Sequence, residues 1–294
     1  MFEGVYTAMV TPFDKNGKVD EDGLRANVKF QIKNGIHGLV PVGTTGECST
    51  LSYEEHNRVI EVVVDAAKGK VPVLAGTGSN STWEALMLTK HAKEVGADGA
   101  LLVVPYYNKP TQAGLYAHFK KIAEEVDIPQ VIYNIPSRTG VNMLPETMAK
   151  LAKLKNIVGV KEASGDMGQV AKIIELTRGQ DFSVISGNDS DTLPIMKLGG
   201  VGVISVASNI VPDKVVRLVE SFRSGDVKTA EKIDRELSPL YKVLFIETNP
   251  GPVKMAMNWM GMAAGGLRLP LVEMEPENKE KLRKVLVEMK LVRS

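Results

Sequence analysis

The sequence predicts an α/β protein built on a (β/α)8 TIM barrel with a C-terminal helical appendage. Short apolar runs rich in Val, Ile and Leu recur at intervals of about 20–35 residues, and the segments between them carry helix start and stop signals. Most of these runs are continuously apolar, as the strands of a parallel sheet are when both faces are covered. Eight strands that alternate with helices are typical of the barrel.

The predicted strands lie between residues 6 and 205. They are Tyr6–Val10, Gly38–Val42, Val71–Ala75, Ala100–Val104, Gln130–Tyr133, Ile157–Val160, Ser183–Ile185 and Val201–Ser205. The structural alternative is a doubly wound parallel sheet, which would carry a glycine-rich fingerprint after its first strand. Thr11–Asp14 follows the first run instead, and this favours the barrel.

Capping residues mark the helices between these strands. Ser52, with Glu55 three residues later, matches a capping box, and Ser81 with Glu84 repeats the pattern. Prolines in first-turn positions and glycines at helix ends mark further boundaries: Pro145, Pro212, Gly35, Gly69 and Gly96.

The strand rhythm stops after residue 210, and three further helical stretches follow at about 226–246, 250–263 and 277–290. We therefore expect a catalytic barrel over residues 1–225 and a C-terminal helical region over residues 226–294. The helical region is expected to pack on the barrel or on a partner subunit.

The composition of the 294-residue chain is that of a globular protein, with 44% hydrophobic and 24% charged residues. Its 36 basic and 35 acidic residues leave a formal net charge of +1, without the basic excess of a nucleic-acid-binding protein. No apolar run approaches the roughly 18–20 residues of a membrane span, and no secretory signal is visible. We expect a cytoplasmic protein that acts on a small molecule, with no nucleic-acid or membrane partner.

Metal and disulfide chemistry find little support in the sequence. The single cysteine, Cys48, excludes an intrachain disulfide and a cysteine metal cluster. The four histidines show no metal-ligand spacing, so we expect no metal site.

In such barrels the functional face is built from the loops that follow the strands. These loops are rich in hydroxyl, amide and glycine residues and poor in charge, unlike sites for phosphate or metal ions. They are Gly43–Glu47, Gly76–Asn80, Pro105–Asn108, Asn134–Gly140, Lys161–Gly165, Gly187–Asp189 and Ala207–Asn209.

Lys161 is the leading candidate for a catalytic residue, because it ends an apolar strand expected inside the barrel. Burial disfavours the ammonium form of a lysine, which leaves a neutral amine able to attack a carbonyl and form a Schiff base. Tyr133 ends the neighbouring fifth strand and Thr44 follows the second, so their hydroxyl groups can converge on the amine. The alternative is a structural lysine that reaches the rim or pairs with Glu162.

Three other polar residues in the loops are candidates for binding or for packing. Arg138 is the only basic residue of the fifth loop, where a guanidinium can bind a carboxylate through two hydrogen bonds, or it is an ordinary loop arginine. Tyr106 and Tyr107 fit aromatic packing at a subunit contact.

The motifs Gly43–Glu47, Tyr133–Gly140 and Gly159–Gly165 together resemble those of the dihydrodipicolinate synthases. These enzymes belong to the pyruvate-dependent class I aldolase family, which includes N-acetylneuraminate lyase. The resemblance runs from Gly4 to the C-terminal helices. It implies a lyase of lysine and diaminopimelate biosynthesis that joins pyruvate to L-aspartate 4-semialdehyde, with no cofactor beyond the covalent imine on Lys161.

The resemblance also assigns roles to single residues. Lys161 forms the imine with pyruvate, Tyr133 donates and accepts protons, and Thr44 and Tyr107 complete a proton relay. The implied substrate-binding residues are Thr45 for the carboxylate of pyruvate, Arg138 for the carboxylate of the semialdehyde, and Gly187 and Ile204 through main-chain groups. The family usually assembles as a homotetramer, a dimer of dimers, in which Tyr107 reaches into the neighbouring subunit's site.

The resemblance extends in part to an allosteric lysine site. Lysine-sensitive members bind lysine at the dimer interface, and this chain matches them at Asn80, Glu84, Tyr106 and His56. The loop over residues 48–53 departs, because Cys48, Ser49 and Tyr53 stand where sensitive bacterial members have Ser, Ala and His. We therefore expect weak or absent inhibition by lysine.

Three alternatives to this function remain. A pyruvate lyase that acts on a sugar acid such as N-acetylneuraminate usually has serine in place of Thr44 and lacks arginine at the position of Arg138. A catalytically inactive binding module would not need all the reactive side chains that this chain has, which are Lys161, Tyr133, Thr44, Tyr107 and Arg138. A phosphosugar aldolase would need more basic groups in the loops.

Overall fold

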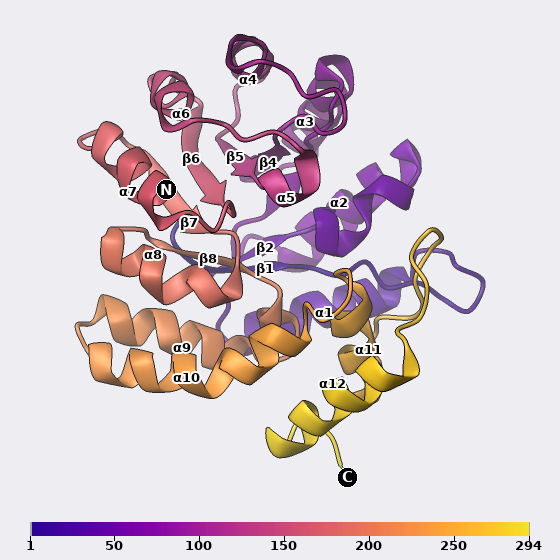
Figure 1. Cartoon of the computed structure of the whole chain (residues 1–294). Coiled ribbons are helices and arrows are strands. Elements are labelled where there is room, and N and C mark those ends of the chain that lie inside the picture. Colours follow the sequence, from indigo (N-terminus) through magenta and orange to yellow (C-terminus); the bar gives the residue numbers. More distant parts are fainter. Residues whose placement is uncertain (1, 294) are drawn as a thin grey trace. The chain divides into compact units, whose positions relative to one another are not determined.

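Eight strands alternate with helices in the computed structural model, which describes residues 2–293 (Figure 1). The strands are β1 (Gly4–Ala8), β2 (Gly38–Val40), β3 (Leu74–Gly76), β4 (Gly99–Val103), β5 (Gln130–Asn134), β6 (Ile157–Glu162), β7 (Ser183–Ser186) and β8 (Gly202–Ser205). All eight predicted strands are confirmed, with ends that differ from the prediction by up to three residues.

The helices fill the intervals between the strands and the C-terminal region. The α-helices are α1 (Glu21–Lys33), α2 (Tyr53–Ala67), α3 (Thr82–Glu94), α4 (Gln112–Glu125), α5 (Pro136–Thr139), α6 (Pro145–Leu151), α7 (Met167–Leu176), α8 (Thr192–Leu198), α9 (Pro212–Arg223), α10 (Val227–Val243), α11 (Gly251–Trp259) and α12 (Pro276–Glu288). Short 3-10 turns are η1 (Thr44–Gly46), η2 (Cys48–Thr50), η3 (Asp189–Asp191) and η4 (Ala207–Asn209).

The predicted helix signals are confirmed. Ser52 and Glu55 form a capping box at the start of α2, and the Ser81 side chain accepts a hydrogen bond from the Glu84 N–H in α3. The predicted prolines stand in the first turns of α6 and α9. Gly35, Gly69 and Gly96 all have φ between 67° and 85° after their helices, a conformation that favours glycine.

The chain divides into two compact units. The first contains the chain up to Gly4 and Pro72–Ile204, and the second contains Val5–Val71 and the chain from Ser205 onward. The chain therefore passes from one unit to the other within β1 and within β8. The boundary at residue 225 that the sequence predicts between barrel and helical region remains a prediction.

In the first unit, β3 to β8 pair in sequence order, and the pairs are parallel. Gly4 joins this run at its end, because its N–H donates to the carbonyl of Val201 at 2.9 Å. A Cβ on Gly202 would lie 1.9 Å from the carbonyl oxygen of Gly4, so only glycine permits this approach of two backbones.

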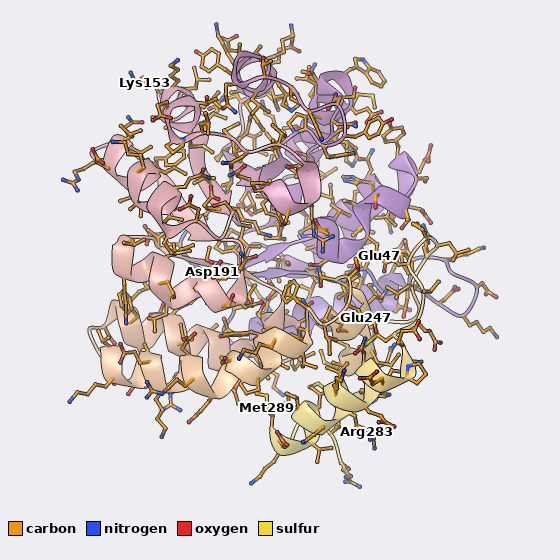
Figure 2. All side chains as sticks on the ribbon, in the orientation of Figure 1. Glu47, Lys153, Asp191, Glu247, Arg283 and Met289 are labelled. Carbon is orange, nitrogen blue, oxygen red and sulfur yellow. The ribbon has the colours of Figure 1, made fainter. Side chains whose placement is uncertain are left out.

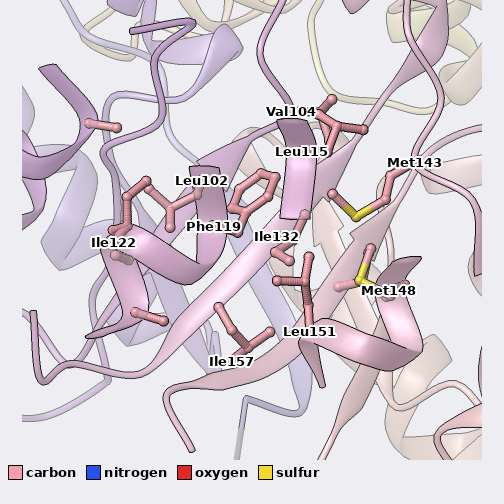
Figure 3. Packing of buried hydrophobic residues seen from close by; sticks show 14 of the residues in the cluster. Leu102, Val104, Leu115, Phe119, Ile122, Ile132, Met143, Met148, Leu151 and Ile157 are labelled. Carbon is pink, nitrogen blue, oxygen red and sulfur yellow. The ribbon is translucent and has the colours of Figure 1, made fainter. Parts of the chain in front are cut away.

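The core of the first unit lies between its strands and the helices outside them. Residues of β4, β5 and β6 pack against α4 and α6 in one cluster of buried side chains (Figure 3). Leu102, Phe119 and Ile132 in this cluster have no exposed surface. Burial of this kind contributes about 1.5–3 kcal/mol for each large side chain, and it fixes the strand ends that carry the candidate site.

In the second unit, β1 pairs with β2 in parallel, with Tyr6 opposite Gly38. A buried hydrogen-bond cycle ties three segments of this unit together: Thr7 Oγ1 donates to Gln31, Gln31 Nε2 donates to the Ser208 carbonyl, and Ser208 Oγ donates to Thr7. Helices α1 and α2 pack together, as do α9 and α10, and α12 packs on α10 and α11.

The C-terminal prediction of three helical stretches is confirmed by α10, α11 and α12. The start of α9 at Pro212 was predicted, whereas α5, a four-residue turn inside the fifth loop, was not. Within residues 2–293, every helix falls short of the length and hydrophobicity that crossing a bilayer requires.

Candidate active site

Lys161 lies near the carboxyl end of β6, directly beside Tyr133 on β5. The two residues are register partners in the parallel pair, and Lys161 Nζ lies 4.1 Å from the centre of the Tyr133 ring. Lys161 is 6% exposed and Tyr133 is 7% exposed. The Lys161 side chain is therefore buried, which rules out the alternative of a lysine that reaches the solvent at the rim.

The surroundings of Lys161 keep about half of its amine neutral at pH 7. The pKa of Lys161 is lowered to about 7, chiefly by burial; the Asp189 carboxylate opposes this shift and the Arg138 guanidinium adds to it. Asp189 is buried, with 2% exposure, and begins the 3-10 turn η3 after β7. A neutral amine beside a tyrosine is a nucleophile suited to attack on a carbonyl.

Arg138 lies on the short helix α5, directly after β5. Pro136 starts the helix and Gly140, with φ of 73°, ends it. The Thr139 hydroxyl donates to the carbonyls of Ile135 and Val141, at 3.0 and 2.9 Å, which fixes the turn. The Arg138 side chain itself is exposed, so its guanidinium is accessible to an anionic group from solution.

Glu162 does not pair with Lys161, because consecutive residues of a strand point to opposite faces. Its buried carboxylate accepts hydrogen bonds from the side chains of Asn134 and Gln169, and from the Ser164 N–H at 2.8 Å. Asn134 Oδ1 in turn accepts from the Met143 N–H. This polar cluster ties the loop after β5 to the end of β6, on the side away from Lys161.

Gly187 and Ile204 contribute backbone to the strand ends of the first unit. A Cβ on Gly187 would lie 2.6 Å from Ala163 Cβ, and the Gly187 N–H donates to the Glu162 carbonyl at 2.7 Å. The carbonyl of Gly187 is therefore the main-chain group left for the predicted role. Ile204 is 1% exposed in β8.

Tyr107, unlike Lys161 and Tyr133, is exposed at the surface. It is 88% exposed, with φ of 69°, in the loop after β4. The Tyr106 carbonyl accepts a hydrogen bond from Asn80 Nδ2, and Asn108 Nδ2 donates to the Asn80 carbonyl, so two loops of the first unit are joined here. Glu84 accepts from the Ser79 hydroxyl at 2.6 Å.

Thr44 and Thr45 form the 3-10 turn η1 of the second unit. Thr45 is buried, and its Oγ1 accepts a hydrogen bond from Asn249 Nδ2 at 3.0 Å. The turn is bracketed by Val42 and Glu47, with φ of 50° and 53°. The left-handed conformation costs a residue other than glycine roughly 1–2 kcal/mol, so the surrounding structure must hold this turn in place.

Glu47 forms a fully buried ion pair with Lys254 of α11. Lys254 Nζ donates to Glu47 Oε1 at 2.7 Å and to the carbonyls of Thr11 and Gly266 at 3.0 and 2.6 Å. The side chains are 0% and 1% exposed, respectively. Glu47 lies among densely packed side chains, whereas Lys153 and Arg283 extend from the surface (Figure 2). Burial lowers the pKa of Lys254, and Glu47 opposes this shift.

The remaining predicted residues of the second unit are His56 and the loop over residues 48–53, which departs from the family pattern. His56 is buried in α2, and Tyr53 at the start of the same helix is 47% exposed. Burial raises the pKa of the Cys48 thiol to about 11, so it stays protonated near neutral pH. In the part of the chain that the structure describes, no three His, Cys, Asp or Glu side chains are grouped to hold a metal ion.

Three residues of these clusters were not predicted from the sequence. Asp189 lies in one of the predicted active-face loops but was assigned no role there, although its position after β7 was a usable signal. Asn249 and Lys254 lie about 200 residues from Thr45 and Glu47 in sequence, and no local pattern connects them.

Known proteins resemble the chain along nearly its whole length. Residues 1–289 match the model of the dihydrodipicolinate synthetase family. A 4-hydroxy-tetrahydrodipicolinate synthase from Methanospirillum hungatei is 57% identical over 288 residues, which cover 97% of this chain and 99% of the relative.

Solved structures resemble the chain equally well. A crystal structure of dihydrodipicolinate synthase from Aquifex aeolicus is 52% identical, covers 100% of both chains and gives a TM-score of 0.97. A structure described as the first monomeric dihydrodipicolinate synthase variant is 47% identical, covers 99% of this chain and 98% of its own, and gives 0.96. The (β/α)8 barrel that the sequence predicts, with additional C-terminal helices, is thereby confirmed.

Proposed function

The chain belongs to the dihydrodipicolinate synthetase family, and we propose that it condenses pyruvate with L-aspartate 4-semialdehyde through a lysine Schiff base. The product is 4-hydroxy-tetrahydrodipicolinate, at the first committed step of lysine and diaminopimelate synthesis. The observation that carries the proposal is the buried Lys161 amine, whose pKa of about 7 makes it a nucleophile at neutral pH.

The reaction begins when the neutral amine of Lys161 attacks the ketone of pyruvate and water leaves, which gives an imine. A protonated imine withdraws electrons, so loss of a proton from the pyruvate methyl group gives an enamine. The enamine carbon attacks the aldehyde of the semialdehyde and forms the new C–C bond. The amino group of the second substrate then attacks the imine carbon, closes the ring and displaces Lys161.

Hydroxyl groups move the protons in this sequence. Tyr133, whose ring lies against Lys161 Nζ, donates and accepts protons around the imine and the aldehyde oxygen. Thr44 and Tyr107 continue the relay toward solvent. By the family resemblance Tyr107 reaches into the site of a second subunit, so that a dimer is the smallest active unit, and its 88% exposure supports this role.

Four residues bind the substrates in this proposal. Thr45 holds the carboxylate of pyruvate through its hydroxyl and N–H, and Gly187 and Ile204 line the pyruvate pocket through main-chain groups. The exposed guanidinium of Arg138 binds the carboxylate of the semialdehyde, for which two parallel hydrogen bonds are the preferred geometry.

The imine supplies the electron sink for the carbanion, so the proposed reaction needs no metal ion or cofactor. We propose a cytoplasmic homotetramer, a dimer of dimers, and sedimentation velocity measures this assembly directly. A monomeric variant is described for one solved relative, so a monomer in sedimentation velocity would contradict this part of the proposal.

The test is consumption of pyruvate with aspartate 4-semialdehyde and, separately, with N-acetylmannosamine as the competing aldehyde. We expect turnover with the semialdehyde alone. Turnover with the sugar alone would show a sugar-acid lyase that uses the same Lys161 chemistry.

Borohydride reduction tests the imine independently of the aldehyde. Mass spectrometry of the wild-type chain should show one pyruvate adduct, located on Lys161, and Lys161→Ala should show none. Full adduct formation in Lys161→Ala would refute the assignment of the nucleophile.

A further inference from the structure

The turn that carries Thr44 and Thr45 is held by side chains from the C-terminal region of the same unit. Thr45 Oγ1 accepts from Asn249, which precedes α11, and Glu47 pairs with Lys254 inside α11. The Gly46 carbonyl accepts from the Thr11 hydroxyl at 2.7 Å. Three consecutive residues of the turn are therefore fixed from outside it.

The ion pair is the most completely satisfied of these contacts. Lys254 Nζ has three protons and three acceptors, so its charge is fully compensated within the protein. The second carboxylate oxygen of Glu47 accepts the Arg268 N–H at 3.1 Å. Lys254 Nζ also lies 4.2 Å from the centre of the Phe13 ring.

Arg268 extends the same cluster along the segment that follows the turn. Its guanidinium donates to the Thr50 carbonyl, to both carboxylate oxygens of Glu55 and to the Gly17 carbonyl. The segment over residues 43–55 is thus attached at several points to residues 254–268, far from it in sequence.

We propose that the buried Glu47–Lys254 ion pair is a positioning device that holds Thr44 and Thr45 in their reactive orientation. Glu47 is the residue whose left-handed backbone ends the turn, so its carboxylate must be held for the strained conformation to persist. The C-terminal region is then part of the catalytic apparatus through Lys254. The roles of Thr44 and Thr45 in this inference rest on the proposed function.

The decisive variant is the double substitution Glu47→Gln with Lys254→Met. A single substitution leaves one buried charge without its partner, which is strongly destabilising, whereas the double substitution removes both charges together and keeps side chains of similar length. The matched control is Glu236→Gln with Lys232→Met, which removes an exposed ion pair from α10 of the same unit.

The first readout is the pyruvate concentration that gives half-maximal borohydride trapping on Lys161. We expect it to rise roughly tenfold or more in the double variant, because the hydrogen bonds from Thr45 to the pyruvate carboxylate are lost. The kcat, calculated per active site that borohydride can trap, should also fall at least tenfold. The maximal amount of trapped pyruvate should stay at the wild-type level. Values within twofold of wild type, or no trapping at any pyruvate concentration, would overturn the proposal.

The second readout is amide hydrogen exchange in the peptide that covers the turn. The Gly46 and Glu47 N–H groups donate to Gly43 and Thr44 carbonyls, and their exchange should accelerate in the double variant but not in the control. Unchanged exchange would refute the positioning role. If wild-type protein trapped no pyruvate, the proposed function would fail, and the exchange result would still decide whether the ion pair holds the turn.

Discussion

The pKa of Lys161 gives a quantitative prediction for the pH dependence of imine formation. A fall from the ordinary value of 10.5 to about 7 corresponds to about 5 kcal/mol between the two protonation states. At pH 7 the neutral fraction of the amine then rises from roughly one molecule in three thousand to about half. We expect short-pulse borohydride trapping of pyruvate to rise with pH around a midpoint near 7.

The perturbation that tests the cause is Asp189→Asn. The Asp189 carboxylate raises the pKa of Lys161 and the Arg138 guanidinium lowers it. Asp189→Asn should therefore move the trapping midpoint to lower pH, and Arg138→Ala should move it to higher pH. Trapping is measured by mass spectrometry between pH 5 and 10, at saturating pyruvate. A wild-type midpoint near 10, or an upward movement in Asp189→Asn, would refute the reasoning.

The same lowered pKa predicts that the free energy of unfolding depends on pH. Between pH 7 and 10.5 the unfolded chain binds a proton at Lys161 that the folded chain does not. The contribution of this residue to the free energy of unfolding therefore rises with pH across that window. Below pH 7 the burial of Lys161 lowers the free energy of unfolding, and replacement of the side chain by a nonpolar one removes this destabilisation.

Two further predictions concern single residues, and a third concerns inhibition by lysine. Arg138→Ala should keep the borohydride-trapped pyruvate adduct but lose turnover with the semialdehyde, because only the second carboxylate loses its partner; normal turnover would contradict this role. Tyr133→Phe should slow the chemical step by roughly 10²–10⁴-fold, the usual contribution of a positioned proton donor, and an unchanged kcat would remove Tyr133 from the mechanism. Lysine should inhibit weakly or not at all, because loss of a polar contact in a buried ligand site weakens binding roughly tenfold to a hundredfold; half-inhibition in steady-state assays at submillimolar lysine would show that the departures at Cys48, Ser49 and Tyr53 do not matter.

The alternation of strands and helices could be predicted because each signal is local. A continuous apolar run such as Gln130–Tyr133 and a capping pair such as Ser52 and Glu55 lie within a few residues of sequence. Strand ends were less accurate, since they depend on pairing: Val71 was expected in β3, which begins at Leu74. The short helix α5 depends on the hydrogen bonds of Thr139, which periodicity does not show.

The candidate site was predictable where a residue's place on a strand determines its environment. Lys161 was expected inside the barrel because it ends an apolar strand, and it is buried beside Tyr133. The partners of these residues were not predictable, since Asp189, Asn249 and Lys254 come from other elements. Contacts between residues separated by about 200 positions, such as that of Lys254 with Glu47, have no signature in a single sequence.

The discontinuous second unit has a consequence for synthesis of the chain on the ribosome. Val5–Val71 belongs with the chain from Ser205 onward, so its native partners emerge only after residues 72–204. At about 5–20 residues per second this delay is about 7–27 seconds. The continuous segment Pro72–Ile204 can fold first, whereas the N-terminal segment, with apolar strands β1 and β2, waits with its hydrophobic surface uncovered. On the nascent chain this segment therefore lacks its native packing partners until the residues from Ser205 onward have emerged.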